Sequence, residues 1–209
     1  MSKFRSLQVQ KFYVVITALL FLHIPVKAIT APVNIIDDNF STISIGKTME
    51  YLEDRAGSMT LEDAQKSTAW KLNTEKGINL GFPKSAYWFR FTSENSLAST
   101  ESWYFEISYP MLDSLKLYAP DDNGLYSMIE TGDHLPFIKR DVDNTGFVFH
   151  FVDSPGVKTY YFRIQTTSAI NFVPVMMSQK AFFKKLNTEQ PILWIYYGLM
   201  IVMAIYNFL

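Results

Sequence analysis

Aromatic and charged side chains alternate with apolar ones along several segments of the chain, and the polar members of this alternation are the candidates for chemistry. In an extended strand, successive side chains point to opposite faces, so every second residue shares a face. Indole and phenol rings among charged groups can stack on a ligand and hydrogen-bond to it. The pattern therefore predicts a binding face for a small polar or carbohydrate-like ligand, made of Trp88, Arg90, Tyr104, Glu106, His150, Tyr161 and Arg163.

A purely structural role for the same residues is the alternative. Arg90 can pair with Glu106 across neighbouring strands while its aliphatic stem lies along Trp88, as opposite charges on adjacent strands commonly do. The residue types alone leave both roles open.

Few residues could support catalysis or bind a metal. The chain has no Cys, which excludes thiolate metal sites, Cys nucleophiles and disulfides. After residue 28 the only histidines are His134 and His150, and neither lies in a metal-ligand motif. Neighbouring carboxylates occur where a linker, a helix start or a turn is expected, at 37–38, 62–63 and 121–122. Capping or solvated roles suit them better than glycosidase chemistry. We expect no enzyme, no metal and no other cofactor.

The charge balance excludes a nucleic-acid partner. The chain has 19 Lys and Arg residues against 20 Asp and Glu, with no basic stripe. Nucleic-acid binding depends on a concentration of positive charge.

The middle of the chain reads as a series of short strands. Apolar and polar residues alternate with a period of two, and Asp, Asn, Gly and Pro mark the turns between runs. A short strand at 43–47 is followed by one or two helical turns at 59–65. Thr60 is the expected N-cap, and Asp63 three residues later completes a variant of the capping box. The remaining expected strands are 78–82, 87–93, 103–109, 114–119, 125–130, 147–152, 159–166 and 172–177. Many short strands without interleaved helices predict an all-β fold, either a sandwich or a barrel.

One face of each expected strand is apolar and should form the core. The excess of aromatic residues, 16% of the chain, falls mostly on these faces. The inward residues are Tyr87, Phe89, Phe91, Phe105, Ile107, Tyr109, Leu115, Leu117, Phe147, Phe149, Phe151, Tyr160, Phe162 and Ile164.

The first 28 residues have the order of a secretory signal peptide. Basic residues come first, the 13-residue apolar run 12–24 follows, and small residues surround Lys27. The run is shorter than the roughly 20 residues of a membrane span. We expect cleavage after Ala28, with an uncleaved anchor as the alternative.

The last 19 residues, 191–209, carry no charge. A helix of this length rises about 28 Å, close to the thickness of the hydrocarbon core. Trp194, Tyr196 and Tyr197 cluster at its start, as amphipathic rings do at headgroup depth. We expect a transmembrane helix here, with further helices after Leu209; a buried terminal helix is the alternative.

Several short motifs resemble one known family in its own order. They are Tyr87-Trp88-Phe89-Arg90-Phe91, Trp103-Tyr104, Tyr109-Pro110, Leu112-Asp113-Ser114-Leu115, Thr131-Gly132-Asp133, Pro136-Phe137 and Tyr160-Tyr161-Phe162-Arg163. Together they resemble the type 2 extracellular domain of bacterial seven-transmembrane receptors with diverse intracellular signalling modules. The end of the chain, from Tyr197-Gly198-Leu199 onward, looks like the start of that family's first membrane helix.

The resemblance implies a jelly-roll-like sandwich akin to carbohydrate-binding modules, followed by seven helices and a cytoplasmic output domain. We therefore expect a signal peptide at 1–28, a linker at 29–42, a sensory sandwich at 43–180, a juxtamembrane linker at 181–190 and the membrane helix. The expected place is the bacterial inner membrane, with the sandwich outside it and a homodimer as one option. A membrane-tethered carbohydrate-binding or adhesion module without signalling is the competing hypothesis.

Overall fold

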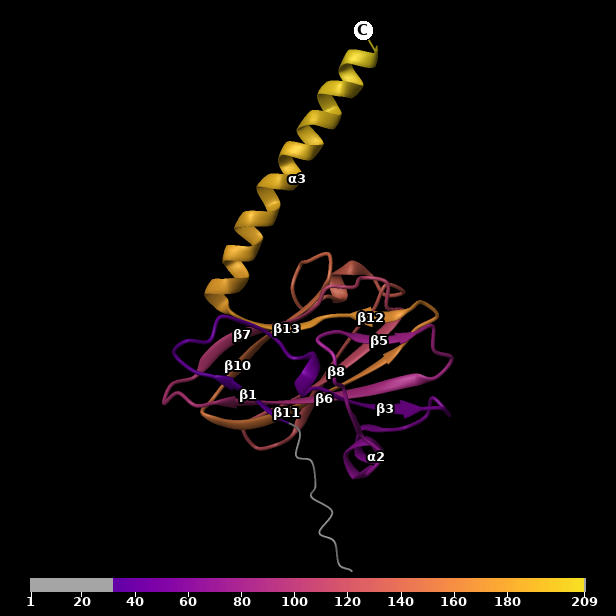
Figure 1. Ribbon diagram of the computed structural model, residues 1–209, viewed down its shortest axis with the longest axis vertical. Helices are drawn as coiled ribbons and strands as arrows, with labels where there is room; N and C mark the ends of the chain where they lie inside the picture. Colours follow the sequence, from indigo (N-terminus) through magenta and orange to yellow (C-terminus); the bar gives the residue numbers. More distant parts are fainter. Residues whose placement is uncertain (1–31, 209) are drawn as a thin grey trace, which may run out of the picture. The chain divides into compact units, whose positions relative to one another are not determined.

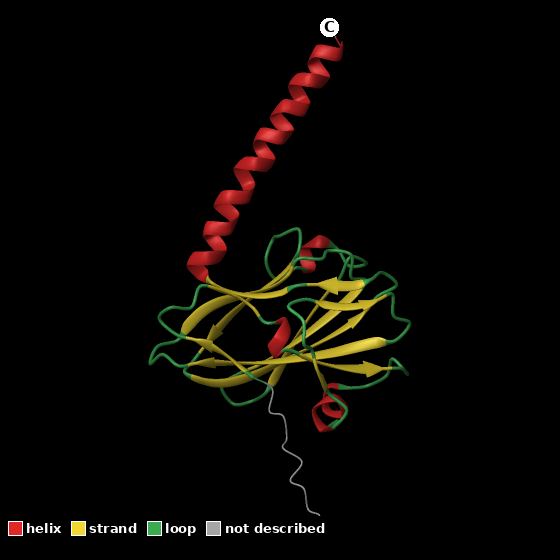
Figure 2. Ribbon diagram, in the orientation of Figure 1, coloured by secondary structure: helices red, strands yellow, loops and turns green. Residues whose placement is uncertain are grey.

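The structure is a computed structural model that describes residues 32–208. The expected signal peptide, residues 1–28, lies outside the described residues. The described part is an all-β sandwich followed by a long helix (Figures 1 and 2), which confirms the all-β prediction.

The larger sheet has seven strands. They are β1 (Val33–Ile36), β3 (Glu50–Asp54), β4 (Lys71–Leu72), β6 (Ala86–Asn95), β8 (Ser114–Pro120), β9 (Tyr126–Thr131) and β11 (Gly156–Gln165). Their order is β4-β3-β6-β11-β8-β9, with antiparallel pairing throughout, and β1 is added parallel to β6. Residues 29–42 were expected to be a linker, but they include β1. Its residue Asn34 donates a hydrogen bond from Nδ2 to the carbonyl oxygen of Thr92, 2.8 Å away.

The smaller sheet has four strands. They are β2 (Thr42–Ser44), β7 (Glu101–Ile107), β10 (Phe147–Asp153) and β13 (Pro174–Ser178), in the antiparallel order β10-β7-β13-β2. A third pair joins β5 (Ile78–Gly81) to β12 (Ile170–Phe172). The single strand expected at 172–177 is therefore two, split at Val173. Pro174 has no N–H to continue the first ladder, and it starts a strand in another sheet.

The core lies between the inner faces of the two main sheets. Phe162 of β11 stacks on Phe89 of β6 with ring centroids 4.9 Å apart, and Phe105 of β7 meets Phe162 across the sandwich at 5.6 Å. The expected inward residues are buried here, except that Tyr87 and Tyr109 are only partly covered. The predicted alternation of faces is confirmed.

A short segment covers the outer face of the larger sheet. It contains the helix α2 (Leu61–Lys66), whose start has the expected capping box: the Asp63 N–H donates to Thr60 Oγ1, and the Thr60 N–H donates to Asp63 Oδ2. Ala64 of α2 is fully buried against that face, in one cluster with Trp88. We call residues 55–70 the strap.

The helix α3 (Gln179–Phe208) begins directly after β13. The Ala181 N–H donates to Ser178 Oγ at 3.3 Å, which caps the first turn. The juxtamembrane linker expected at 181–190 and the helix expected from 191 thus form one helix, with Pro191 inside it. A membrane span was expected at 191–209; among residues 32–208, however, no helix combines the length and apolar character that a bilayer crossing needs.

Candidate functional site

Four of the seven predicted site residues lie together on the outer face of the larger sheet. Strand register places Trp88 opposite Arg163, and Arg90 opposite Tyr161. The strap covers them: Trp88 is 0% exposed, and Tyr161 and Arg163 are also buried. Side chains of the strap thus occupy the position predicted for a ligand.

Arg90 is paired, but its partner is not the predicted one. Its Nε donates to Glu50 Oε2 at 2.6 Å, and its guanidinium carbon lies 4.4 Å from the centroid of the Trp70 ring. The expected pair with Glu106 does not form, because β6 and β7 belong to different sheets. The structural alternative is therefore correct in expecting an ion pair for Arg90, but the partner is Glu50 and not Glu106.

Arg163 fastens the strap to the sheet. Its Nη2 donates to Asp54 Oδ2 at 3.2 Å and to the carbonyl oxygen of Gly57 at 2.8 Å. Nearby, Trp88 Nε1 is buried without a hydrogen-bond partner in the part of the chain that the structure describes. The face is therefore a packed interior layer, in which most polar groups are satisfied by the chain itself.

The other three predicted residues lie on the outer face of the smaller sheet. The Tyr104 ring stacks on Phe182 of α3 at 4.1 Å, and Glu106 accepts from Lys185 Nζ at 2.6 and 2.7 Å. His150 is exposed, with Nε2 2.7 Å from Ser102 Oγ. The outer faces of a sandwich point in opposite directions, so the seven residues make two groups and no single site.

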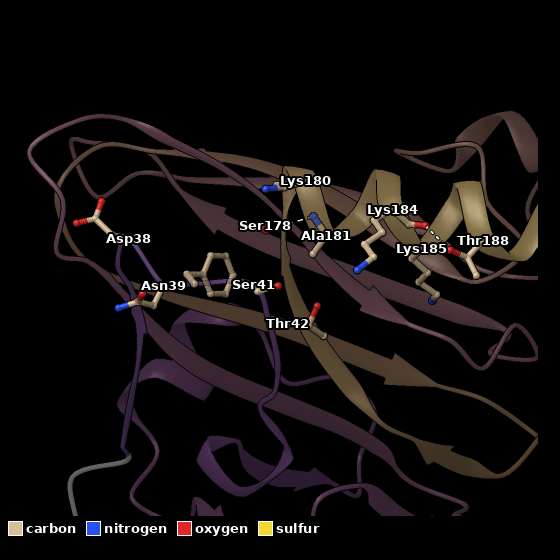
Figure 3. A pocket seen from close by; sticks show the side chains of 11 residues that line it. Asp38, Asn39, Ser41, Thr42, Ser178, Lys180, Ala181, Lys184, Lys185 and Thr188 are labelled. Carbon is tan, nitrogen blue, oxygen red and sulfur yellow. Dashed lines mark hydrogen bonds between the residues drawn. The ribbon is translucent and has the colours of Figure 1, made fainter.

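A pocket lies beside α3, next to the second of these groups. Its volume is about 640 Å³, and Figure 3 shows its lining from close by. One wall comes from the β1–β2 connection and β2, the other from the first three turns of α3. The lining residues are Asp38, Asn39, Phe40, Ser41, Thr42, Ser178, Lys180, Ala181, Lys184, Lys185 and Thr188.

The lining of this junction pocket is half polar and half apolar, and it carries more positive than negative charge. It contains three ammonium groups, of Lys180, Lys184 and Lys185, and one carboxylate, of Asp38. Lys184 reaches from α3 toward Thr42, whereas Asp38 lies at the far end of the lining (Figure 3). The Lys185 ammonium is shared with Glu106. Ammonium, hydroxyl and amide groups around one hollow can bind an anionic group and the hydroxyls beside it.

The sequence did not single out this pocket. Its walls are about 140 positions apart, and the ladder between β13 and β2, which places Met177 opposite Thr42, brings them together. In the sequence, Lys184 and Lys185 stand out only as charges that precede the uncharged end of the chain. Nothing in their spacing indicates the opposite wall.

A second polar group lies at another edge of the sandwich. Asp113, Asp133 and His134 place possible ligand atoms within 4.8 Å of one another. Both Asp113 oxygens already accept hydrogen bonds, from Thr166 Oγ1 and from the N–H and hydroxyl of Thr167. Burial acts to raise the pKa of Asp113, but these hydrogen bonds outweigh it and lower the pKa. The carboxylate therefore anchors the turn at 166–168.

Comparison with known proteins finds one matching family and several solved structures with low similarity. Residues 46–178 match the family described as 7TMR-DISM extracellular 2. A search of curated proteins finds no match. Similar solved structures include the β-glucosidase from Kluyveromyces marxianus in complex with glucose, at 8% identity and a TM-score of 0.36 over 62% of this chain; the chain spans 15% of that enzyme.

Two smaller modules are also similar. TmCBM61 in complex with β-1,4-galactotriose has 10% identity and a TM-score of 0.32, over 68% of this chain and 90% of that one. CsCBM6-3 from Clostridium stercorarium in complex with cellobiose has 12% identity and a TM-score of 0.28, over 71% and 98%. At these values the likeness carries no argument about the ligand.

Proposed function

Because the chain belongs to the 7TMR-DISM extracellular 2 family, we propose that it is the ligand-sensing, extracytoplasmic part of a bacterial membrane receptor. It binds its ligand without converting it, and α3 carries the signal onward. The observation that carries this proposal is the position of the junction pocket, which has one wall on the sandwich and the other on α3.

A ligand in this pocket touches both parts that would have to move. Phe182 and Lys185 hold α3 on the smaller sheet through Tyr104 and Glu106. A ligand shifts an equilibrium only by its difference in affinity for the two states. A ligand that bridges Thr42 and Lys184 binds the docked arrangement of α3 better than an undocked one, and so provides that difference.

The lining indicates the class of ligand. Lys180 and Lys184 favour at least one negative charge, whereas the Lys185 ammonium already pairs with Glu106. The hydroxyl and amide groups of the lining favour a polar body. The ring of Phe40, which also lines the pocket, offers an apolar surface. We propose a small acidic, carbohydrate-like or otherwise hydroxylated anion, such as a uronic acid or a sugar phosphate.

The C-terminal half of α3 is the proposed link to the bilayer. From Pro191 to Phe208 it has no charged residue. Its large apolar side chains between Trp194 and Phe208 are each more than half exposed. Apolar surface on this scale favours a lipid surrounding. Export by a signal peptide at 1–28 would place the sandwich outside the inner membrane.

Binding to the full chain in lipid vesicles tests the proposal. A panel of uronic acids, sugar phosphates and matched neutral sugars is screened by thermal shift. Lys184→Ala should weaken binding of an acidic hit by roughly tenfold, the effect of losing one charge-assisted hydrogen bond. Lys47→Ala, an exposed lysine outside the pocket, is the control.

A measurement on α3 distinguishes a receptor from a membrane-tethered binding module without signalling. Hydrogen exchange of the amides at 182–186 should slow when the ligand is bound. A ligand whose affinity is unchanged by Lys184→Ala and Thr42→Ala would contradict the pocket assignment. Binding without any change at 182–186 would favour an adhesion or cell-wall-binding module.

A further inference from the structure

The connection between β9 and β10 presents two apolar side chains to solvent. They lie in the short helix η2 (Phe137–Lys139), where Ile138 is 89% exposed and Phe137 is 53% exposed. Single exposed apolar side chains are common on proteins, so exposure alone decides nothing. The fixed conformation and the position of this pair are more informative.

One arginine fixes the conformation. The Arg140 guanidinium lies 4.8 Å from the centroid of the Phe137 ring and 4.6 Å from that of Phe147. Its Nη1 also donates to three successive carbonyl oxygens, those of residues 144–146, at 2.7–2.9 Å. Packing Ile138 back onto the domain would therefore disturb the backbone of this connection, which Arg140 holds through these hydrogen bonds.

The same connection adjoins α3. Val142 packs against the cluster formed by Tyr104, Val148, Met177 and Phe182, to which Leu186 of α3 also contributes. In Figure 1, the β9–β10 connection and the start of α3 lie at the same end of the sandwich. The exposed pair thus lies on the side of the sandwich from which α3 extends toward the uncharged half of that helix.

We propose that η2 is a second membrane contact, in which Ile138 and Phe137 insert at the boundary between lipid headgroups and acyl chains while Lys139 extends toward the lipid phosphates. Short apolar segments with a basic neighbour bind bilayer surfaces in this way. The proposal rests on the bilayer placement of α3 given above. It would hold the sandwich at a fixed tilt against the membrane, using two points of attachment.

Charge indicates which lipids should matter. The connection also contains Asp133, Asp141 and Asp143, which offset Lys139 and Arg140. Attraction to anionic lipid is therefore weak, and the apolar pair drives the contact. Insertion should occur in phosphatidylcholine vesicles and change little with salt.

Site-specific labels test the contact in the full chain. The chain has no Cys, so Ile138→Cys gives a single site for a polarity-sensitive fluorophore. Met203→Cys on α3 is the positive control. Leu125→Cys, 70% exposed on the β8–β9 turn of the other sheet, is the negative control. Brominated phosphatidylcholine should quench the labels at 138 and 203 and spare the label at 125.

The outcomes separate the two proposals. A label at 138 that remains unquenched while 203 is quenched overturns the η2 contact and leaves the placement of α3 intact. Labels at 138 and 203 that both remain unquenched overturn the bilayer placement and the η2 contact with it. A second pair of variants controls for the possibility that the label at 138 itself disturbs the contact. A label on Phe137→Cys should be quenched, and adding Ile138→Asp should abolish that quenching without changing the melting temperature.

Discussion

Lys185 Nζ and Glu106 Oε1 lie 2.6 Å apart and join α3 to the outer face of the smaller sheet. Glu106 is 5% exposed, and a carboxylate at this depth needs a partner. The docking of the helix and the burial of this charge therefore depend on each other.

Lys185→Met should lower the free energy of unfolding by about 2 kcal/mol, because Glu106 is left buried without its charge partner. This is below the usual range for a buried pair, since the lysine side chain is 32% exposed. Chemical denaturation measures the change. Adding Glu106→Gln should restore most of the loss, and Lys184→Met should have no measurable effect. A double variant as unstable as the single one would contradict the pairing argument.

Arg90→Ala should lower the free energy of unfolding by about 2–4 kcal/mol, because Glu50 is 7% exposed and would lose its ion pair. Arg55→Ala breaks a pair in which the arginine is 85% exposed, and should change stability little. Equilibrium unfolding compares the two. Equal effects would show that the buried pair of Arg90 and Glu50 contributes no more to stability than an exposed one.

Substitution of the core aromatics tests the assignment of faces. Phe105→Ala, Phe149→Ala and Phe162→Ala should each cost about 3–5 kcal/mol of stability, since each ring is fully enclosed. Phe82→Ala, at a side chain 79% exposed, is the matched control. Melting temperatures that fall no more than that of the control would show that these rings do not face the core.

Asp113 should make stability depend on acid. Its pKa is lowered in the folded state, so it stabilises the fold above its unfolded pKa, near pH 4. The contribution is lost as the pH falls through the lower folded value. The stability difference between the wild type and Asp113→Asn should therefore shrink below pH 4 in an acid titration of unfolding. A difference that stays constant from pH 6 to pH 2 would argue against the carboxylate as the anchor.

The sequence predicted the elements whose signal is local. Alternation in 87–93 and 159–166 identified both strands and their buried faces, because the period of two is visible within one segment. The capping box at Thr60 is equally local. By contrast, β1 has only two buried residues, Asn34 and Ile36, and it depends on β6 for its pairing. No pattern within 33–36 announces that partner.

The arrangement of the predicted site residues in two groups could not be read from the sequence for a different reason. Alternation assigns a residue to the outer face of its strand, but not to one of the two sheets. Trp88 and Tyr104 were both correctly placed outward, yet they lie on opposite sides of the sandwich. Alternation also does not reveal what covers a face, and here the strap and α3 do so. The ligand-binding role of these residues stays a prediction.

The direct step from Ser178 of β13 to Gln179 of α3 also sets the helical phase. Each residue of an α-helix turns it by about 100° and advances it by 1.5 Å. The half after Pro191 is apolar on all sides and specifies no preferred rotation of its own. The stacking of Phe182 on Tyr104 therefore determines the azimuth at which every later side chain faces its surroundings. Changing the length of this junction by a single residue would point another stripe of α3 toward any neighbouring helix.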